Sequence, residues 1–374
     1  MTGSRLIITC MRNEGPFILE WIAYHRSIGF DDFLVFTNDC DDGTVELLEA
    51  LQDHGVLTTM DNPYQRIEGG MNPQKGALFY ANDTEQVARA EWIMVSDVDE
   101  FVNIHAGDGT LDALWQTVGA DVDNISMQWR LFGNADVDSY RDEWVTDQFD
   151  RCAPTFCPSP VQAWAVKTLL RTTGGKFPCG RYKRLGVHRP IDPGAGATEQ
   201  TNWVDGSGRP VLRKFRENGW RFGTHSHGYG LVTLNHYAVR SADSFLVKRD
   251  RGRVNHVERD QGLAYWLRMN FNMERDTSIR RHLPRAKAER DRLLALGDVQ
   301  ARHADAVEAH RAKIRDLKTR DDMAAFHAEI TSDRMKLISR HLNLLSRDQF
   351  NAGPDAIGPE IFERIERVPE LLAE

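Results

Sequence analysis

The sequence predicts an α/β fold in which a mostly parallel central sheet is flanked by helices and followed by a helical C-terminal region. Two observations support this prediction. In residues 1–101, short apolar runs alternate with segments of helical periodicity, which is typical of parallel strands joined by right-handed crossovers. Residues 286–318 are rich in Ala, Arg, Glu and Leu, which favours a long exposed helix. The chain has 374 residues, 41% of them hydrophobic, enough for one large domain or two.

The first part of the chain predicts four strands with helices between them. Residues 6–11, 33–37, 56–60 and 92–96 are short apolar runs of the kind that form buried strands. The first helix begins at Pro16, because proline suits the first helical turn, and ends at Gly29. Further helices are expected around residues 45–51 and 74–89. The carboxyl ends of these strands should meet at one sheet edge, where α/β proteins bind ligands.

The second part is less regular. Residues 125–132 and 232–237 predict strands, and residues 151–223 are rich in Gly and Pro, which indicates long functional loops. We therefore expect one α/β domain over residues 1–255, with halves at 1–101 and 102–255, and a helical region over 256–374.

Two aspartates follow the predicted strand 92–96. Asp97 and Asp99 lie at the end of an apolar run, with Glu100 beside them. Buried carboxylates are costly unless their charge is compensated, and Mg²⁺ or Mn²⁺ is a common partner of carboxylate oxygens. A turn with solvated acids is the alternative. Two more polar loops, 12–14 and 38–39, follow neighbouring strands and favour a shared binding site.

The charge distribution narrows the class of ligand. The net charge is −8, yet residues 240–292 contain 14 Lys and Arg against 8 Asp and Glu. A basic segment in an acidic protein favours an anionic ligand such as a diphosphate, and it leaves peripheral contact with an acidic membrane open. Nucleic acid is not expected as a partner, because no binding motif is present and the pI is about 5.9.

The cellular compartment and the redox state of the cysteines are predicted from the apolar runs, the N-terminal residues and the number of cysteines. No apolar run approaches the ~18 residues that span a bilayer, and the first residues do not resemble a signal peptide. We therefore expect a cytoplasmic protein. The cysteines are odd in number and scattered, which predicts reduced thiols rather than a disulfide framework. They are Cys10, Cys40, Cys152, Cys157 and Cys179.

Four segments together resemble glycosyltransferases of the GT-A fold, nearest the family 2 and family 92-like enzymes. Their order and spacing, rather than any one of them, carry the resemblance. They are Met11-Arg12-Asn13-Glu14 with Glu20 to His25; Phe36-Thr37-Asn38-Asp39 with Asp42-Gly43-Thr44; Glu91 to Phe101; and Leu234-Asn235-His236-Tyr237 with Ser241, Phe245, Lys248, Arg251 and Gly252. The resemblance implies a nucleotide-binding half at 1–101 and an acceptor-side half at 102–255.

The resemblance also implies a metal site that holds Mn²⁺ or Mg²⁺. Asp99 would bind the cation directly, Asp97 would bind the ribose or a metal-bound water, and His236 would be a further ligand. Glu100 could orient these groups. His225 and His227, in Thr-His-Ser-His, and His188 are rivals of His236.

The donor nucleotide would contact the loops after the first strands. The residues implied for the nucleoside are Arg12, Asn13, Glu14, Asn38 and Asp39, with helix capping as their alternative role. Lys75, Lys248 and Arg251 are candidates for the diphosphate. A solvated lysine is the alternative for Lys75, and a basic helix face is the alternative for the other two.

The acceptor side is less defined. Trp129, Phe132 and Trp203 could stack on sugar rings, or they could belong to the core. An inverting enzyme needs a base on the acceptor hydroxyl, and Asp205 is preferred over Asp138 and Asp192. The Glu-Asp and Gln-x-x-Arg-Trp signatures common in family 2 do not follow here.

These inferences lead to one expected function and two alternatives. We expect a metal-dependent, inverting glycosyltransferase that uses a UDP-sugar and a glycan acceptor in polysaccharide biosynthesis. A nucleotidyltransferase is disfavoured, because the loop after the first strand has a single glycine, Gly15. A non-catalytic scaffold would use its C-terminal helices for interaction, and the same helices could support an oligomer.

Overall fold

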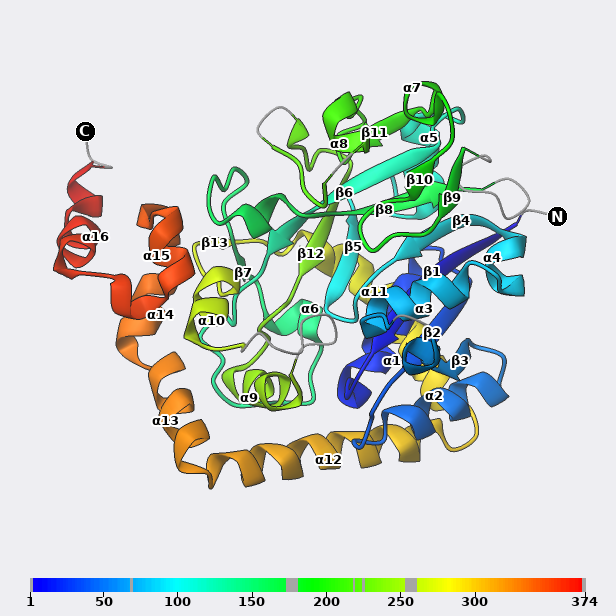
Figure 1. The fold of residues 1–374 in the computed structure, drawn as a ribbon. Coiled ribbons are helices and arrows are strands. Elements are labelled where there is room, and N and C mark those ends of the chain that lie inside the picture. Colours follow the sequence, from blue (N-terminus) through cyan, green and yellow to red (C-terminus); the bar gives the residue numbers. More distant parts are fainter. Residues whose placement is uncertain are drawn as a thin grey trace.

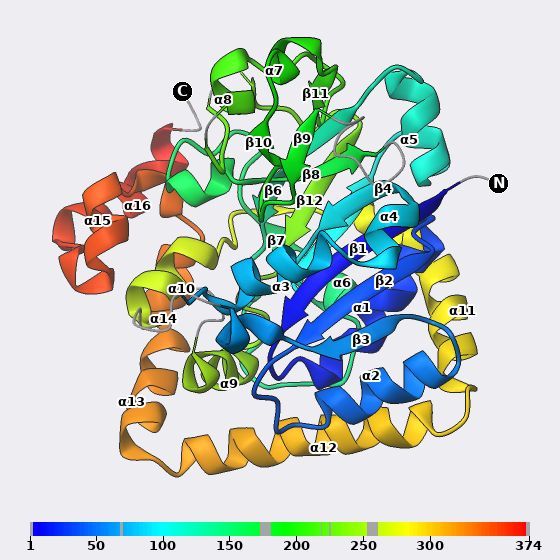
Figure 2. The same cartoon turned by 45° about the vertical axis from the view of Figure 1, so that its right-hand side comes forward.

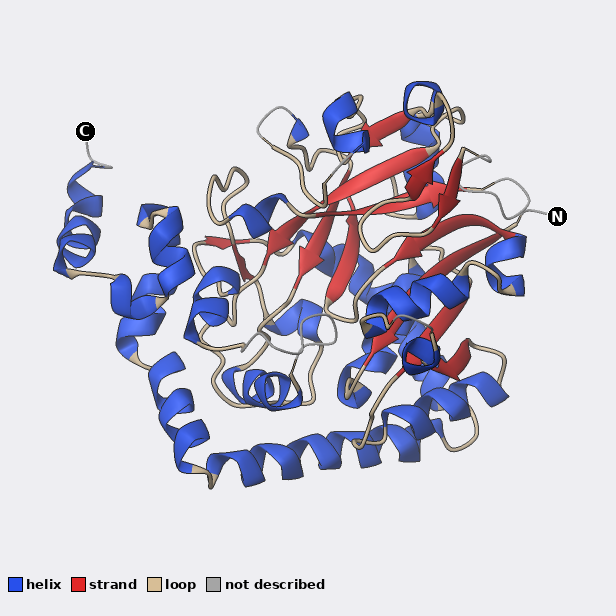
Figure 3. Cartoon of the chain, in the orientation of Figure 1, coloured by secondary structure: helices blue, strands red, loops and turns tan. Residues whose placement is uncertain are grey.

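The computed structural model describes residues 3–67, 70–172, 181–217, 219–223, 226–252 and 261–371. His225, Cys179 and the predicted boundary between residues 255 and 256 lie outside these ranges. The chain folds around one large twisted sheet with helices on both faces, and the C-terminal helices wrap around its lower side (Figures 1 and 3). The predicted α/β architecture with a mostly parallel, helix-flanked sheet is confirmed.

The central sheet has the strand order β3-β2-β1-β4-β8-β6-β12-β5, and β11 pairs with β6. Strands β1 to β4 are parallel to one another, as the sequence predicts. Antiparallel pairs occur only in the second half of the described sheet, where β8 pairs with β4 and β6, and β12 pairs with β5. The strands are β1 (Ser4–Met11), β2 (Asp32–Thr37), β3 (Thr58–Asp61), β4 (Ala90–Val95), β5 (Glu100–Ile104), β6 (Asn124–Leu131), β7 (Arg151–Cys152), β8 (Val166–Arg171), β9 (Tyr182–Arg184), β10 (Ile191–Pro193), β11 (Trp203–Asp205), β12 (Val232–His236) and β13 (Glu274–Arg275).

Helices cover both faces of the sheet because its first strands are apolar on both sides. In β1, Ile7 packs in the cluster that includes α1, α2 and α11, whereas Leu6 and Ile8 pack with α3 and α4 on the opposite face. The helices are α1 (Gly15–Ser27), α2 (Thr44–Asp53), α3 (Pro73–Ala81), α4 (Glu85–Arg89), α5 (Leu111–Val118), α6 (Val145–Gln148), α7 (Ala197–Gln200), α8 (Arg213–Glu217), α9 (Ala242–Arg251), α10 (Leu263–Met269), α11 (Leu283–Leu294), α12 (Val299–Lys318), α13 (Asp321–Ile330), α14 (Asp333–Ser339), α15 (Arg347–Ala352) and α16 (Pro359–Leu371), with short 3₁₀ segments between some of them.

Local signals predicted the ends of several elements. Helix α1 begins beside Pro16 and is followed by Gly29, whose φ of 117° is the backbone conformation expected of glycine after a helix. Two long predicted helices are each divided. The segment 74–89 forms α3 and α4, because Thr84 caps a second helix start, and the segment 286–318 forms α11 and α12 around Gly297.

The C-terminal helices pack against the α/β part rather than standing apart. Helix α12 runs beneath α2 and α9 in both views of the ribbon (Figures 1 and 2). Its Val299 belongs to the main core, and its Ile314 and Leu317 belong to a second cluster formed with α9, α10 and α13. Within the described residues, no helix combines the length and apolarity needed to cross a bilayer.

Candidate functional site

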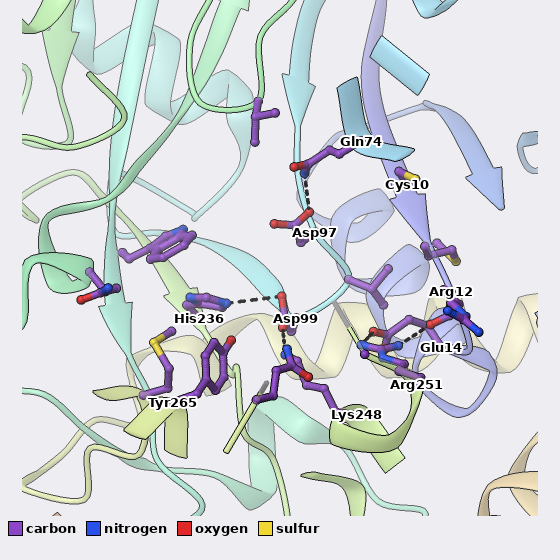
Figure 4. A pocket seen from close by; sticks show the side chains of 18 of the residues that line it. Cys10, Arg12, Glu14, Gln74, Asp97, Asp99, His236, Lys248, Arg251 and Tyr265 are labelled. Carbon is purple, nitrogen blue, oxygen red and sulfur yellow. Dashed lines mark hydrogen bonds and ion pairs between the residues drawn. The ribbon is translucent and has the colours of Figure 1, made fainter. Parts of the chain in front are cut away.

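A pocket of about 670 Å³ opens where β1 and β4 end and where β12 and α9 approach them (Figure 4). Residues that are distant in sequence therefore line the same pocket. The lining residues include Cys10, Arg12, Glu14, Gln74, Asp97, Asp99, Trp129, Gln162, His188, Trp220, His236, Lys248, Arg251, Tyr265 and Arg268.

The turn 97–99, which we call the acidic turn, is stabilised by hydrogen bonds to Glu100. The Glu100 carboxylate accepts hydrogen bonds from the Asp97 amide at 2.9 Å, the Ser96 hydroxyl at 3.2 Å and the Trp129 indole at 2.7 Å. Glu100 is fully buried, and burial raises its pKa to about 7 against the opposing charge of Lys167. Glu100 therefore supports the turn and is not itself a pocket-lining residue. Its predicted role in orienting the groups around a metal stays a prediction.

Asp97 contacts residues from two other elements. Its Oδ1 accepts from the Gln74 amide at 3.0 Å, and its Oδ2 lies 3.1 Å from the Lys167 ammonium. Lys167 is completely buried in β8 and also lies 3.5 Å from Glu100. Burial alone would lower the pKa of Lys167, but the two carboxylates raise it above its ordinary value. The buried ammonium thus compensates the charge behind the acidic turn.

Asp99 contacts the far part of the chain. Its Oδ2 accepts from the Lys248 ammonium at 2.7 Å, and its Oδ1 lies 3.4 Å from His236 Nε2. Burial acts to raise the pKa of Asp99, but Lys248 and His236 outweigh it and hold the pKa well below its ordinary value. The structure therefore brings Asp99, His236 and Lys248 together, as the sequence predicted.

Glu14 joins the first loop to α9. Its carboxylate lies 2.8 Å from Arg240 and 2.5 Å from Arg251, and all three side chains are nearly buried. Burial raises the pKa of Glu14, yet the two guanidinium groups lower it below the ordinary value. Arg251 also donates to the Asn13 carbonyl at 2.9 Å and to the Arg12 carbonyl. Arg251 therefore holds the loop that was predicted to bind the nucleoside.

The other predicted nucleotide residues lie just outside the pocket lining. Asn13 and Asp41 exchange hydrogen bonds of 2.5 and 3.0 Å, which ties the loop after β1 to the loop after β2. Asn38 donates to the Asp39 carboxylate at 3.3 Å, and the Asp39 carbonyl accepts from Arg12 at 3.2 Å. These residues shape the loops around Arg12. Lys75 also lies outside the lining, and its neighbour Gln74 faces the pocket instead.

The structure places the acceptor-side candidates in different surroundings. Trp129 lines the pocket, but Phe132 and Trp203 are fully buried core residues. Asp205 ends β11 outside the pocket lining, where its carboxylate accepts from Arg209 at 2.9 Å and from the Ser207 and Arg209 amides. Because these bonds close a turn, they speak against Asp205 as a base for an acceptor in the pocket. His227 also lies outside the lining and contacts Gln128 at 3.2 Å.

Three important contacts were not anticipated. Lys167, Arg240 and Gln74 each hold a predicted residue in place, yet none belongs to the segments that carry the family resemblance. A lysine between Val166 and the apolar pair Leu169–Leu170 is the one local signal that could have indicated a buried cation.

The fit of a divalent cation rests on two converging donors. Asp99 Oδ1 and His236 Nε2 lie 3.4 Å apart, and adjacent ligands of an octahedral Mg²⁺ lie about 3 Å apart. Among the residues that the structure describes, no three His, Cys, Asp or Glu side chains form a metal-binding group. The Asp97 oxygens face Gln74 and Lys167 instead. Of the described residues, Asp99 and His236 are thus two candidate ligands rather than a complete cage.

Comparison with known proteins supports the sequence resemblance in the first part of the chain. The model of glycosyltransferase family 92 matches residues 7–152. A glycosyltransferase family 92 protein of Oryza sativa subsp. japonica is 29% identical over 114 residues, which are 30% of this chain and 18% of that protein. A Ricinus communis protein of the same family is 26% identical over 129 residues, 34% of this chain and 22% of its own length. The chain therefore matches about a fifth of these relatives.

A solved structure gives a much weaker similarity. The crystal structure of S. aureus TarS 1-349 in complex with UDP is 11% identical, with a TM-score of 0.29 over 91% of each chain. The region matched by the family model includes most of β1, all of β4 and the acidic turn. The chain therefore contains a glycosyltransferase family 92-like domain.

Proposed function

We propose that the protein is a metal-dependent glycosyltransferase of the GT-A type that moves a sugar from a UDP-sugar to a glycan acceptor. The observation that carries the proposal is the meeting of Asp99, His236 and Lys248 in one pocket at the carboxyl ends of β1 and β4. This is the sheet edge at which α/β proteins bind ligands. The family 92-like region, which includes Asp99, supports sugar transfer as the chemistry.

The donor diphosphate would bind to the basic side of the pocket. Lys248 and Arg251 come from the last turns of α9, and Arg12 reaches the same side from the loop after β1. Figure 4 shows these three side chains on one side of Asp99 and His236 on the other. Guanidinium and ammonium groups stabilise phosphate oxygens by charge-assisted hydrogen bonds. This arrangement would orient the donor and stabilise the charge of the departing nucleotide.

Asp99 and His236 would hold Mn²⁺ or Mg²⁺, and Asp97 would lie close enough to contact the ribose. When bound, a divalent cation acts as a Lewis acid on phosphate oxygens. Because only two candidate ligands converge among the described residues, we propose that the cation binds together with the donor, whose phosphates would supply further oxygens. Lys248, which now pairs with Asp99, would then be able to contact the diphosphate.

Calorimetry with UDP in the presence and absence of Mn²⁺ tests the proposal. We expect Mn²⁺ to tighten UDP binding in the wild type and to have no effect in Asp99→Asn, since this change keeps the size of the side chain but removes its charge. Asp53→Asn is the matched control, because Asp53 is exposed at the end of α2. UDP binding that does not respond to Mn²⁺ in the wild type, or a response that survives in Asp99→Asn, would contradict the proposal.

A further inference from the structure

The pocket has a second wall that the donor site does not use. A series of neighbouring aromatic rings begins at His236. The ring centroids of His236 and Trp129 are 4.1 Å apart, those of Trp129 and His188 are 6.2 Å apart, and those of His188 and Trp220 are 5.9 Å apart. All four residues line the pocket. We call Trp129, His188 and Trp220 the aromatic wall.

Trp220 is the outermost member of the aromatic wall and is unusually exposed for its size. It is 37% accessible, whereas Trp21, Trp203 and Trp266 are almost completely buried. Its backbone is nevertheless fixed, because the Trp220 carbonyl accepts from the Val166 amide at 3.1 Å and the next residues pair with Ala165 and Trp164. The Arg221 guanidinium lies 5.8 Å from the ring centroid. The exposed ring is therefore presented by a rigid segment beside β8.

Polar groups accompany the rings. His188 Nδ1 lies 2.9 Å from the Val166 carbonyl, which can only accept, so Nδ1 carries the hydrogen and Nε2 is left as an acceptor. Burial, helped by the charge of Lys167, lowers the pKa of His188 to about 4, so the ring is neutral near pH 7. Gln162 adds an amide to the same pocket lining. This part of the pocket thus combines aromatic faces with neutral hydrogen-bonding groups.

We infer that the aromatic wall is the acceptor subsite and that it binds an uncharged sugar ring of a glycan. One face of a pyranose carries C–H groups that pack on an aromatic ring, and its hydroxyls can both donate and accept hydrogen bonds. Trp220 would supply the face, and His188 and Gln162 would supply hydrogen-bond partners. This inference rests on the proposed function, because it needs the donor site on the opposite side of Asp99.

The neutrality of the aromatic wall determines the class of acceptor. The basic residues Arg12, Lys248 and Arg251 belong to the donor side, and Lys167 is buried and paired with Asp97 and Glu100. Arg268, which also lines the pocket, donates to the Phe350 carbonyl. Next to the aromatic wall, the Arg221 guanidinium lies beside the Trp220 ring, and Arg189 donates to the carbonyls of Gly219, Arg216 and Glu217. The three side chains of the aromatic wall carry no positive charge near pH 7, so an acidic sugar stacked on them would lose part of its hydration without a cation in the wall itself to replace it. A neutral sugar has no such penalty. We therefore expect neutral oligosaccharides to bind better than those that contain uronic acids.

The test measures retention of the full chain on two oligosaccharide arrays in the presence of UDP and Mn²⁺. One array carries neutral β-linked hexose and pentose oligomers, and the other carries uronic acid oligomers. We expect retention on the neutral array. Trp220→Ala should weaken it about tenfold or more, and Trp220→Phe should retain most of it because the ring remains. Phe79→Ala removes an equally exposed aromatic residue outside the pocket lining and should change nothing.

Calorimetry with UDP and Mn²⁺ on the same variants separates the two proposals. UDP affinity should stay at the wild-type value in Trp220→Ala. If neutral oligosaccharides bind equally well to Trp220→Ala, if acidic oligomers are preferred, or if neither array retains the protein while UDP binds, the acceptor subsite is refuted and the donor site stands. Loss of Mn²⁺-dependent UDP binding in the wild type itself would refute the proposed function.

Discussion

Apart from Arg12, the charged residues that the two halves of the α/β part contribute to the pocket are of opposite sign. Residues up to 101 supply the carboxylates of Glu14, Asp97 and Asp99, with Glu100 beneath them. Their cationic partners come from β8 and from the region after β12 and are Lys167, Arg240, Lys248 and Arg251. Each carboxylate therefore gains its cationic partner only when the second half has folded against the first. The pocket therefore forms only when the two halves pack together, because each half supplies part of its lining.

The C-terminal helices strengthen the basic side of this arrangement. Asp243 of α9 pairs with Lys318 at 2.6 Å, and Asp250 pairs with Lys313 at 2.7 Å and with Arg320 at 2.9 Å. Helix α9 carries Lys248 and Arg251, so α12 and the residues that follow it hold the helix that completes the site. The carboxylates of Glu14, Asp97 and Asp99, in contrast, lie in the loops that follow the sheet strands β1 and β4.

The largest effect is expected for Glu14→Gln. This change leaves Arg240 and Arg251 buried without their shared carboxylate, and breaking a buried ion pair typically costs about 3–5 kcal/mol. Urea unfolding would measure the free energy of unfolding. Glu308→Gln is the control, because Glu308 and its partner Arg315 are exposed and such a pair contributes little to stability. Equal losses in the two variants would contradict the idea that the halves are joined by buried charge pairs.

A smaller decrease in the free energy of unfolding, about 3 kcal/mol, is expected for Lys167→Met at pH 8. The change leaves Asp97 and Glu100 without their cation, and the loss should shrink at pH 6, because Glu100, whose pKa is already about 7, can become protonated there. The free energy of unfolding at both pH values is the measurement. Lys287→Met, at an exposed pair with Asp147, should have little effect at either pH. A loss independent of pH would show that Glu100 does not depend on Lys167.

The smallest effect concerns His310, which lies where α12 meets α9 and contacts the Ser244 hydroxyl at 3.2 Å. Burial, with the charge of Arg240, lowers its pKa to about 3 in the folded chain. A lowered folded-state pKa means that stability is present above the unfolded value of about 6.5 and is lost as the pH falls towards the folded value. When the pH is lowered from 6.5 to 5, the protonation of His310 in the unfolded chain should decrease the free energy of unfolding by about 2 kcal/mol.

Urea unfolding of the wild type and of His310→Gln across this pH range tests the contribution. Glutamine does not titrate, so the variant should lose less stability than the wild type when the pH is lowered. Identical pH dependence in the two proteins would mean that His310 does not titrate within this interface. His341→Gln serves as the comparison, since His341 lies away from the pocket in the C-terminal helices and is less buried.

The sequence by itself predicted what depends on local patterns. The apolar runs of β1, β2, β3 and β4 and the signals at Pro16 and Gly29 predicted the parallel half of the sheet and the first helix. Because the carboxyl ends of parallel strands meet at one edge, Arg12, Glu14, Asp97 and Asp99 could be assigned to one pocket. His236, Lys248 and Arg251 followed from the family resemblance.

Only the tertiary structure decided which partners these residues have. Lys167 comes from an antiparallel strand inserted between β4 and β6, and this order cannot be deduced from periodicity, which is the same for either neighbour. Asp205, which was the preferred base from the sequence, closes a turn with Arg209. In α3, Gln74 lines the pocket and the predicted Lys75, one residue further along the helix, does not. Long-range charge pairing and side-chain direction are set by packing, whereas strand ends are set by local sequence.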